Sequence, residues 1–193
     1  MGLDGVELIM RFEKEFRVAI PDPEAENMGC LGDVVKWLYH HISIVQPPKP
    51  LYNHLAQRLE TGLHRLGITE QMAPQRKLTS FIPDENILET WQLLSQYSGL
   101  QLPSLAYKEV LKTKKNKFSL FKSQMIPCLP DLRFQQLVEC AGALEYKNLI
   151  DFDCITSLFE ITIAIMGIIE ELIGVGIQNI RWEASFVHDL GIN

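Results

Sequence analysis

The sequence predicts an all-α protein of two small helical bundles, the first of them assembled from both ends of the chain. Apolar residues recur at helical spacing through most of the 193 residues. A proline-rich break, QPPKP at 46–50, divides this pattern into two parts. The segment 10–21 then reappears without a gap at 92–103, which indicates an internal repeat.

The composition is that of an ordinary globular protein. Apolar residues make up 47% of the chain and charged residues 22%, which argues against global disorder. The net charge of −6 argues against a general nucleic-acid binder, because such proteins need a positive surface. The four cysteines show no CxxC or Cys/His spacing, so we expect reduced thiols in the cytoplasm and no metal site.

Neither a secretion signal nor a transmembrane segment is expected. No basic and apolar leader precedes the first predicted helix. The most apolar run, ITIAIMGII at 161–169, is flanked by glutamates and is too short for a bilayer, which needs about 20 residues. We therefore expect a soluble, cytoplasmic protein.

The N-terminal segment, 1–45, contains three predicted helices. The first runs from Leu3 to Phe16, and one of its faces is apolar: Val6, Ile9, Phe12 and Phe16. It must end before Pro21, because the residue that precedes a proline avoids the α region. A short acidic turn of helix follows in PDPEAEN. The third helix is DVVKWLYHHI at 33–42, with Asp33 as its expected N-cap.

After the linker at 46–50, the segment 51–150 reads as a second helical unit. Its predicted helices are 51–68, 87–103 and 134–150. Between the last two lies 104–131, a Lys-rich insertion that we expect to be irregular.

The C-terminal segment, 153–193, holds a long apolar helix at 154–175 and a closing loop. The pattern at 170–190, a helix that ends at Gly-aliphatic and a loop with apolar anchors, echoes 63–82. The C-terminal helix therefore corresponds to 51–68, the first predicted helix of the second unit. We predict that it completes the first bundle.

Two stretches of the sequence resemble the acyl carrier proteins. GLDGVELIM, IPDPEAE and GDVV, within 2–38, are similar to that family's second, third and fourth helices. IIEELIGVGIQNIRWEASFVHDLGIN, from about 165 to 193, resembles its first helix and the loop that leads to its DLG motif. The middle, 51–150, matches as a faint and degenerate copy. Placing Asn193 before Gly2 restores the family's order, so the resemblance implies a carrier fold closed by its own C-terminus or, in a swapped homodimer, by a neighbour's.

The sequence departs from the family at the attachment site. In carrier proteins the residue before LD is a serine that is esterified to phosphopantetheine. Here that residue is Gly2, and Asp84 aligns with it in the middle unit. Ser80 and Ser185 lie in the preceding loops, where the family does not place its cofactor. The resemblance therefore implies a protein without phosphopantetheine, and nothing in the sequence predicts another cofactor.

The resemblance also implies a partner-binding surface on the first helix. Its acidic side chains, Asp4, Glu7, Glu13 and Glu15, match the face with which carrier proteins meet basic patches on enzymes. The alternative is a solvated helix face without a partner. Our leading hypothesis is a non-enzymatic, acyl-carrier-like protein that binds enzymes or regulators of acyl or polyketide-type metabolism. The alternatives are a functional carrier, modified at an atypical serine or completed by another chain, and a purely structural helical module.

Other candidate features are assigned simpler roles. The lysines between Lys112 and Lys122 would suit an anionic membrane surface or an acidic partner, or form a solvated insertion. His40 and His41 are expected to complement the C-terminal end of a helix dipole. His188 precedes Asp189, which resembles the DLG aspartate that shapes the family's loop. The tryptophans are assigned to the core. We find no P-loop, dinucleotide fingerprint or catalytic triad, so no enzyme is predicted.

Overall fold

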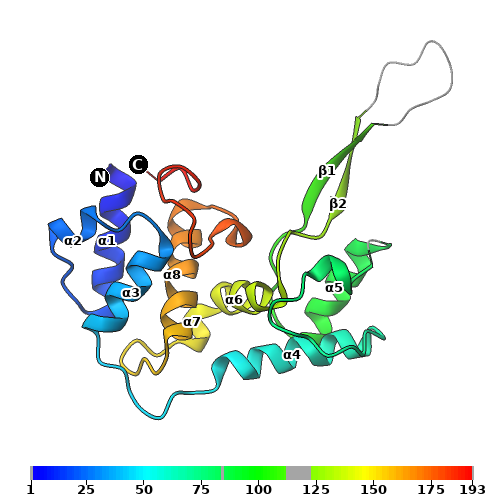
Figure 1. Ribbon diagram of the computed structural model, residues 1–193, viewed down its shortest axis with the longest axis horizontal. Coiled ribbons are helices and arrows are strands. Elements are labelled where there is room, and N and C mark those ends of the chain that lie inside the picture. The colour runs from blue at the N-terminus through cyan, green and yellow to red at the C-terminus, as the bar shows by residue number, and fades with distance from the viewer. Residues whose placement is uncertain (1, 84, 112–122, 193) are drawn as a thin grey trace.

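The computed structural model describes residues 2–83, 85–111 and 123–192 (Figure 1). These residues are mostly helical, as predicted, and they also contain one two-stranded antiparallel sheet. The mostly helical character of the predicted fold class is therefore confirmed, and the small sheet is an element that the sequence did not predict.

Four helices form what we call the terminal group: α1 (Leu3–Phe16), α2 (Asp22–Glu26), α3 (Leu31–His41) and α8 (Leu158–Ile173). Helix α8 packs against both α1 and α3, so segments from the two ends of the chain share one core (Figure 1). The buried stripe of α1 contains Leu8, Phe12 and Phe16. Val6, which the sequence placed on the buried face, points to solvent.

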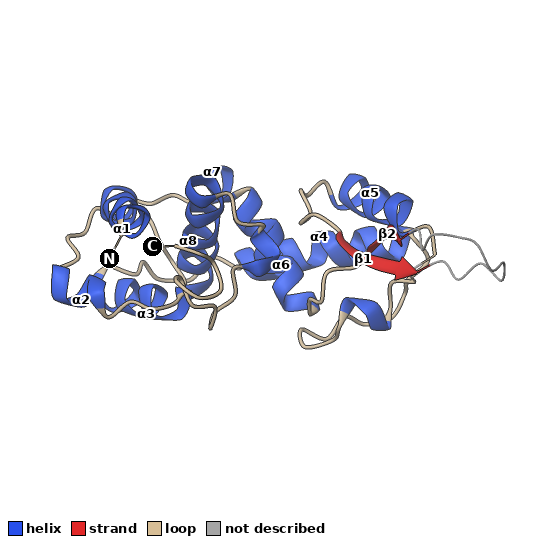
Figure 2. Ribbon diagram, turned by 90° about the horizontal axis from the view of Figure 1, so that it is seen from above, coloured by secondary structure: helices blue, strands red, loops and turns tan. Residues whose placement is uncertain are grey.

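The remaining elements form the central group: α4 (Leu51–Arg65), α5 (Ile87–Ser98), the two strands and α6 (Phe134–Leu144). Helix α4 packs against α5 and α6. Helix α6 also packs against α8, and the short α7 (Tyr146–Leu149) contacts both α6 and α8. The two groups consequently lie side by side along the long axis, and α6 is the helix of the central group that meets α8 of the terminal group (Figures 1 and 2).

The two strands, β1 (Ala106–Leu111) and β2 (Ser123–Cys128), pair antiparallel with Ala106 opposite Cys128. They project from the body of the protein as an arm (Figure 1). An irregular insertion was predicted here, and that prediction is wrong for these residues. Each strand is short, and Pro127 within β2 weakens the strand signal because proline cannot donate to a ladder. Residues 112–122, with the lysines considered above, lie outside the described residues.

The start of α3 corrects a second prediction. Cys30, not Asp33, is the N-cap, and Asp33 stands three positions into the turn. The Asp33 carboxylate accepts the backbone N–H groups of Gly29 and Cys30 at 3.1 and 3.2 Å. Gln136 does the same at the start of α6, where it accepts the N–H of Arg133 at 2.8 Å. Both helices therefore begin with a side chain that reaches back to the N-cap.

Helix α8 is shorter than the predicted 154–175. It begins after Ser157, whose hydroxyl accepts the N–H of Glu160, and ends before Gly174 in the left-handed region. The predicted helix 134–150 is likewise divided into α6 and α7. Within the described part of the chain, no helix combines the length and apolarity needed to cross a membrane.

The internal repeat extends to the helix ends. Helix α1 ends at Arg17 with φ 51°, and α5 ends at the matching residue, Gly99, with φ 63°. Helices α4 and α8 are each followed by a glycine with positive φ, Gly67 at 83° and Gly174 at 74°. These residues adopt the left-handed conformation that terminates helices.

The repeat also extends to the loops after α4 and α8. An isolated antiparallel bridge joins Ser185, in the loop after α8, to Cys30 at the start of α3. The corresponding bridge joins Lys77, in the loop after α4, to Arg133 at the start of α6. The loop after α8 thus holds the start of α3, and the loop after α4 holds the start of α6.

Candidate functional site

The four acidic residues predicted to bind partners play different parts in the structure. Asp4 and Glu7 are exposed on the outer side of α1. The Glu13 carboxylate is half-buried and accepts a backbone N–H from the loop after α1 at 2.7 Å. Glu15 pairs with Arg11 at 3.0 Å, one turn earlier on the same helix. Of the four, Asp4 and Glu7 are therefore the ones whose side chains are exposed without a role in the helix or the loop after it.

Exposed apolar side chains of α1 lie beside these two carboxylates. Leu3 is 83% exposed, Val6 44% and Met10 63%. Their spacing places them along one stripe of α1, because residues three and four apart share a helix face. We call Leu3, Asp4, Val6, Glu7 and Met10 the α1 face. Sequence periodicity missed it because Val6 fits the apolar spacing of the buried stripe as well as that of the outer one.

A mostly apolar cavity of about 680 Å³ lies behind this helix. Leu8 and Phe12 of α1, Ala25 of α2, and Phe186 of the C-terminal loop line it. Gly2 lies at the same cavity and is the N-cap of α1, where it has no side chain to offer. The position of the family's attachment serine thus borders an apolar space.

The two loop serines differ in their surroundings. Ser185 lines the same cavity as Gly2, and its hydroxyl accepts the N–H of His188 at 3.3 Å. Its own N–H donates to the carboxylate of Asp189 at 2.8 Å, so Asp189 shapes this loop. Ser80 is exposed in a short 3₁₀ helix, where its hydroxyl donates to a backbone carbonyl at 2.7 Å. Asp84, the other residue aligned with the attachment site, is outside the described residues.

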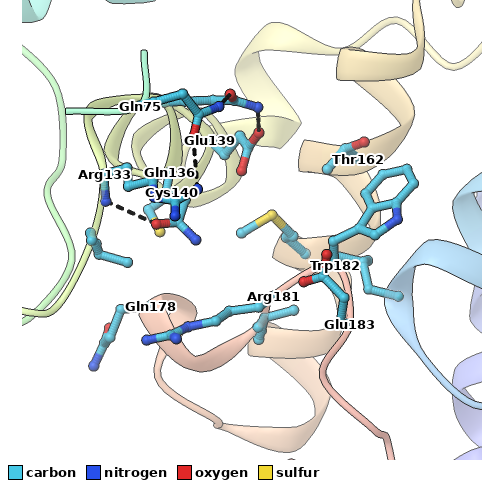
Figure 3. A pocket seen from close by; sticks show the side chains of 15 residues that line it. Gln75, Arg133, Gln136, Glu139, Cys140, Thr162, Gln178, Arg181, Trp182 and Glu183 are labelled. Atoms are coloured by element: carbon cyan, nitrogen blue, oxygen red, sulfur yellow. Dashed lines mark hydrogen bonds between the residues drawn. The ribbon is translucent and has the colours of Figure 1, made fainter. Parts of the chain in front are cut away.

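Another candidate site lies where α6 meets α8 and the loop 178–183 (Figure 3). Two cavities of about 290 and 410 Å³ adjoin there, and four residues line both: Gln135, Glu139, Thr162 and Trp182. We call the two cavities together the junction groove. Its residues come from segments far apart in the sequence, so no motif could have predicted it.

Glu139 is the central charged group of this groove. Burial raises the pKa of its carboxyl, a hydrogen bond from Gln135 lowers it, and the charge of Glu183 raises it again. Burial likewise raises the pKa of Tyr52, and the charge of Glu139 adds to that effect. Glu139 therefore interacts with residues of both cavities.

A chain of hydrogen bonds leads to Glu139 from the rim of the groove (Figure 3). The Arg133 guanidinium donates to Gln75 at 2.7 Å, and the Gln75 amide donates to Gln135 at 3.3 Å. Gln135 in turn donates to the Glu139 carboxylate at 2.8 Å. This chain fixes the orientation of Glu139 through neutral amides.

The histidines, tryptophans and cysteines considered in the sequence make contacts that stabilise the fold or lie at the surface. His40 and His41 are exposed in the last turn of α3, and the His41 ring stacks on Trp37 with centroids 3.9 Å apart. Trp91 is buried, whereas Trp37 and Trp182 are half-buried against the core. All four cysteines are free thiols, and burial raises the pKa of Cys140 to about 12. Among the described residues no cluster of His, Cys, Asp and Glu could hold a metal ion.

No protein-family model matches the sequence, and no solved structure matches the fold. The function is therefore argued from the α1 face, with the cavity behind it, and from the junction groove.

Proposed function

We propose that this protein is a non-enzymatic, acyl-carrier-like protein that binds partner proteins through the α1 face and holds no phosphopantetheine. The observation that best supports this proposal is the exposed stripe Leu3, Val6 and Met10 beside Asp4 and Glu7. Exposed apolar patches bordered by polar residues are typical of protein interaction sites. The carboxylates would draw a basic partner toward the stripe and keep other acidic surfaces away.

In this proposal both groups are carrier-like bundles. The terminal group, from 1–45 and 153–193, would be the first bundle, and 51–150 the second, with the β arm in place of a third helix. Support comes from the matching helix ends, Arg17 with Gly99, and from the two bridges that hold α3 and α6. A swapped homodimer, closed by a second chain's α8, is the alternative assembly.

The cavity beside Gly2 favours a second candidate, a carrier that is modified at an atypical serine or completed by another chain. Ser185 lines this apolar cavity and bears a hydroxyl. The intact mass of the protein after co-expression with a broad-specificity phosphopantetheinyl transferase separates the two candidates. An unmodified chain agrees with the leading proposal. A gain of one phosphopantetheine would replace it by the carrier, and Ser185→Ala would then identify the modified residue.

Partner binding is tested by reversing charge on the α1 face. Glu7→Lys combined with Asp4→Lys should abolish capture of partners from the organism's own proteins. The matched control is Glu89→Lys, because Glu89 is the exposed residue of α5 that corresponds to Glu7 in the repeat. Glu13 is left unchanged because its carboxylate holds the loop after α1.

Two outcomes would contradict the proposal. One is that the double variant retains every partner that the wild-type protein captures. The other is capture that is indifferent to salt, because contacts between exposed charges weaken at high ionic strength whereas apolar packing does not. Salt-independent capture would favour the purely structural module.

A further inference from the structure

The junction groove combines cationic, acidic and apolar surface. Its 290 Å³ cavity is bordered by the guanidinium groups of Arg133 and Arg181. Its 410 Å³ cavity is bordered by apolar and aromatic side chains: Tyr52, Pro74, Leu158 and Phe159. Glu139 lines both cavities and therefore lies where the cationic end and the apolar end meet.

Glu139 is a half-buried carboxylate that no cation neutralises within the described part of the chain. Its hydrogen-bond donor is the neutral amide of Gln135, at 2.8 Å. Glu183, the other acidic residue of the groove, adds repulsion. A desolvated carboxylate is costly unless it is paired, so this position favours a cationic ligand group. An ammonium group would supply both the charge and the hydrogen-bond donors.

The two arginines are held by neutral acceptors. Arg133 donates to the side-chain oxygen of Gln75 at 2.7 Å, and Arg181 donates to the backbone carbonyl of Asp131 at 3.4 Å. Their positive charges are therefore not cancelled by these partners. Guanidinium groups at a cavity rim are well suited to a carboxylate, which they bind by paired hydrogen bonds.

The apolar end accepts a side chain of substantial size. Tyr52 and Phe159 meet edge to face, with ring centroids 5.3 Å apart, and form an aromatic wall. Leu158, at the same cavity, is 40% exposed. An aromatic or branched aliphatic group placed there would cover apolar surface that is otherwise in contact with water.

We infer that the junction groove binds a free α-amino acid with an aromatic or large aliphatic side chain. Its carboxylate would face Arg133 and Arg181, its ammonium group Glu139, and its side chain the wall formed by Tyr52 and Phe159. The cavities, about 290 and 410 Å³, are of the size that small-molecule ligands occupy. This inference is independent of the partner-binding function proposed above.

The first test is a titration of the intact protein with L-phenylalanine, followed by tryptophan fluorescence and calorimetry. Trp182 lines both cavities, so a fluorescence change that disappears in Trp182→Phe places the ligand in the groove. Three analogues each lack one feature: N-acetyl-L-phenylalanine the ammonium group, phenethylamine the carboxylate, and glycine the side chain. Each should bind at least about tenfold more weakly than L-phenylalanine, since a charge-assisted contact or a buried ring is worth more than 1.4 kcal/mol.

Glu139→Gln supplies the decisive variant, because it keeps the shape and the hydrogen bond from Gln135 but removes the charge. It should weaken L-phenylalanine binding by about tenfold or more and leave N-acetyl-L-phenylalanine unaffected. Glu89→Gln, the same substitution on α5, should bind like wild type. Circular dichroism confirms that each variant is folded.

Three results would overturn the inference. The first is the lack of a saturable response to L-phenylalanine, or to L-leucine as the aliphatic representative, up to about 10 mM, where binding becomes too weak to be specific. The second is equal binding of L-phenylalanine by wild type and Glu139→Gln. The third is binding of the three analogues as tight as that of L-phenylalanine.

Discussion

The terminal and central groups share their helix ends and loop bridges but differ in what they present to solvent. On α1 the outer stripe is Leu3, Val6 and Met10. The matching positions are Glu85, which precedes α5, and Leu88 and Gln92 on α5. Leu88 is 51% exposed, so α5 retains one of the three apolar residues. The backbone conformations at the helix ends are thus alike in the two groups, whereas the outer faces of α1 and α5 differ. This difference is why we assign partner binding to α1.

The two groups also differ in the element that follows α1 in one and α5 in the other. The terminal group places the short α2 beside α1, and the cavity of about 680 Å³ lies between them and the C-terminal loop. The central group places the β arm at the corresponding point in the chain. The two groups therefore match at their helix ends and loop bridges and differ in the element between the paired helices.

The largest expected effect comes from cavities made at matching buried positions of α1 and α5. Phe12 of α1 and Leu94 of α5 occupy corresponding positions, and both are fully buried. Phe12→Ala should cost about 4 kcal/mol of unfolding free energy and Leu94→Ala about 3 kcal/mol, the usual costs of such truncations. Urea denaturation followed by circular dichroism measures both.

The shape of those transitions sharpens the comparison. Because α6 packs against α8, we expect one cooperative transition in each variant. A variant that unfolds in two steps, with the unmutated group surviving, would show that the groups are independent domains.

The next effect concerns the contact between the groups. A Cβ atom added at Gly167 of α8 would lie 2.6 Å from the backbone oxygen of Ala143 in α6. Backbone cannot yield as a side chain does, so Gly167→Ala should destabilise the protein by about 2 kcal/mol. At Gly142 the nearest atoms are side-chain methyl groups 3.1 Å away, and Gly142→Ala should cost less. Thermal melts of the two variants test this order, and equal losses would mean that α6 and α8 can separate without cost.

A smaller effect tests whether the two matching helix-ending glycines, Gly67 and Gly174, contribute equally to stability. Gly67 and Gly174 follow α4 and α8 with φ of 83° and 74°, and nothing lies within 4 Å of an added Cβ. Alanine at either position is therefore penalised by conformation alone, by about 1.5 kcal/mol. The two losses should agree within about 0.5 kcal/mol, because the same conformational penalty applies at both positions and no steric contact adds to it. A clear difference in chemical denaturation would mean that one loop relaxes where the other does not.

Much of the helical pattern could be predicted from the sequence, because periodicity, prolines and the Gly-aliphatic helix ends are local signals. The different roles of the acidic residues on α1 could not be predicted, because the contact of Glu13 with the backbone of Ile20 depends on how the chain turns after α1. The β arm was missed because its strands are short and β2 contains Pro127. The junction groove was missed because Glu139, Arg181 and Tyr52 meet only in the folded chain.

The smallest effect concerns Glu139, the residue of the central group that faces the terminal group across the groove. Burial raises its pKa, so the unfolded chain releases this proton at lower pH than the folded protein does. Ionisation therefore costs the folded state stability as the pH rises through the folded pKa, and the cost is complete above it. Glu139→Gln removes this cost and should stabilise the protein at neutral pH by about 1 kcal/mol, the common size of a favourable substitution.

The pH dependence makes this last prediction specific. Below the ordinary pKa of a glutamate, about 4.3, both states hold the proton, and the gain from Glu139→Gln should vanish. Melting temperatures measured from pH 4 to pH 8 test this, with Glu89→Gln as the exposed control. A variant that is less stable than wild type at neutral pH would show that the carboxylate is satisfied within the protein. A variant that is more stable, yet loses L-phenylalanine, would identify a residue whose charge is kept for binding at the expense of stability.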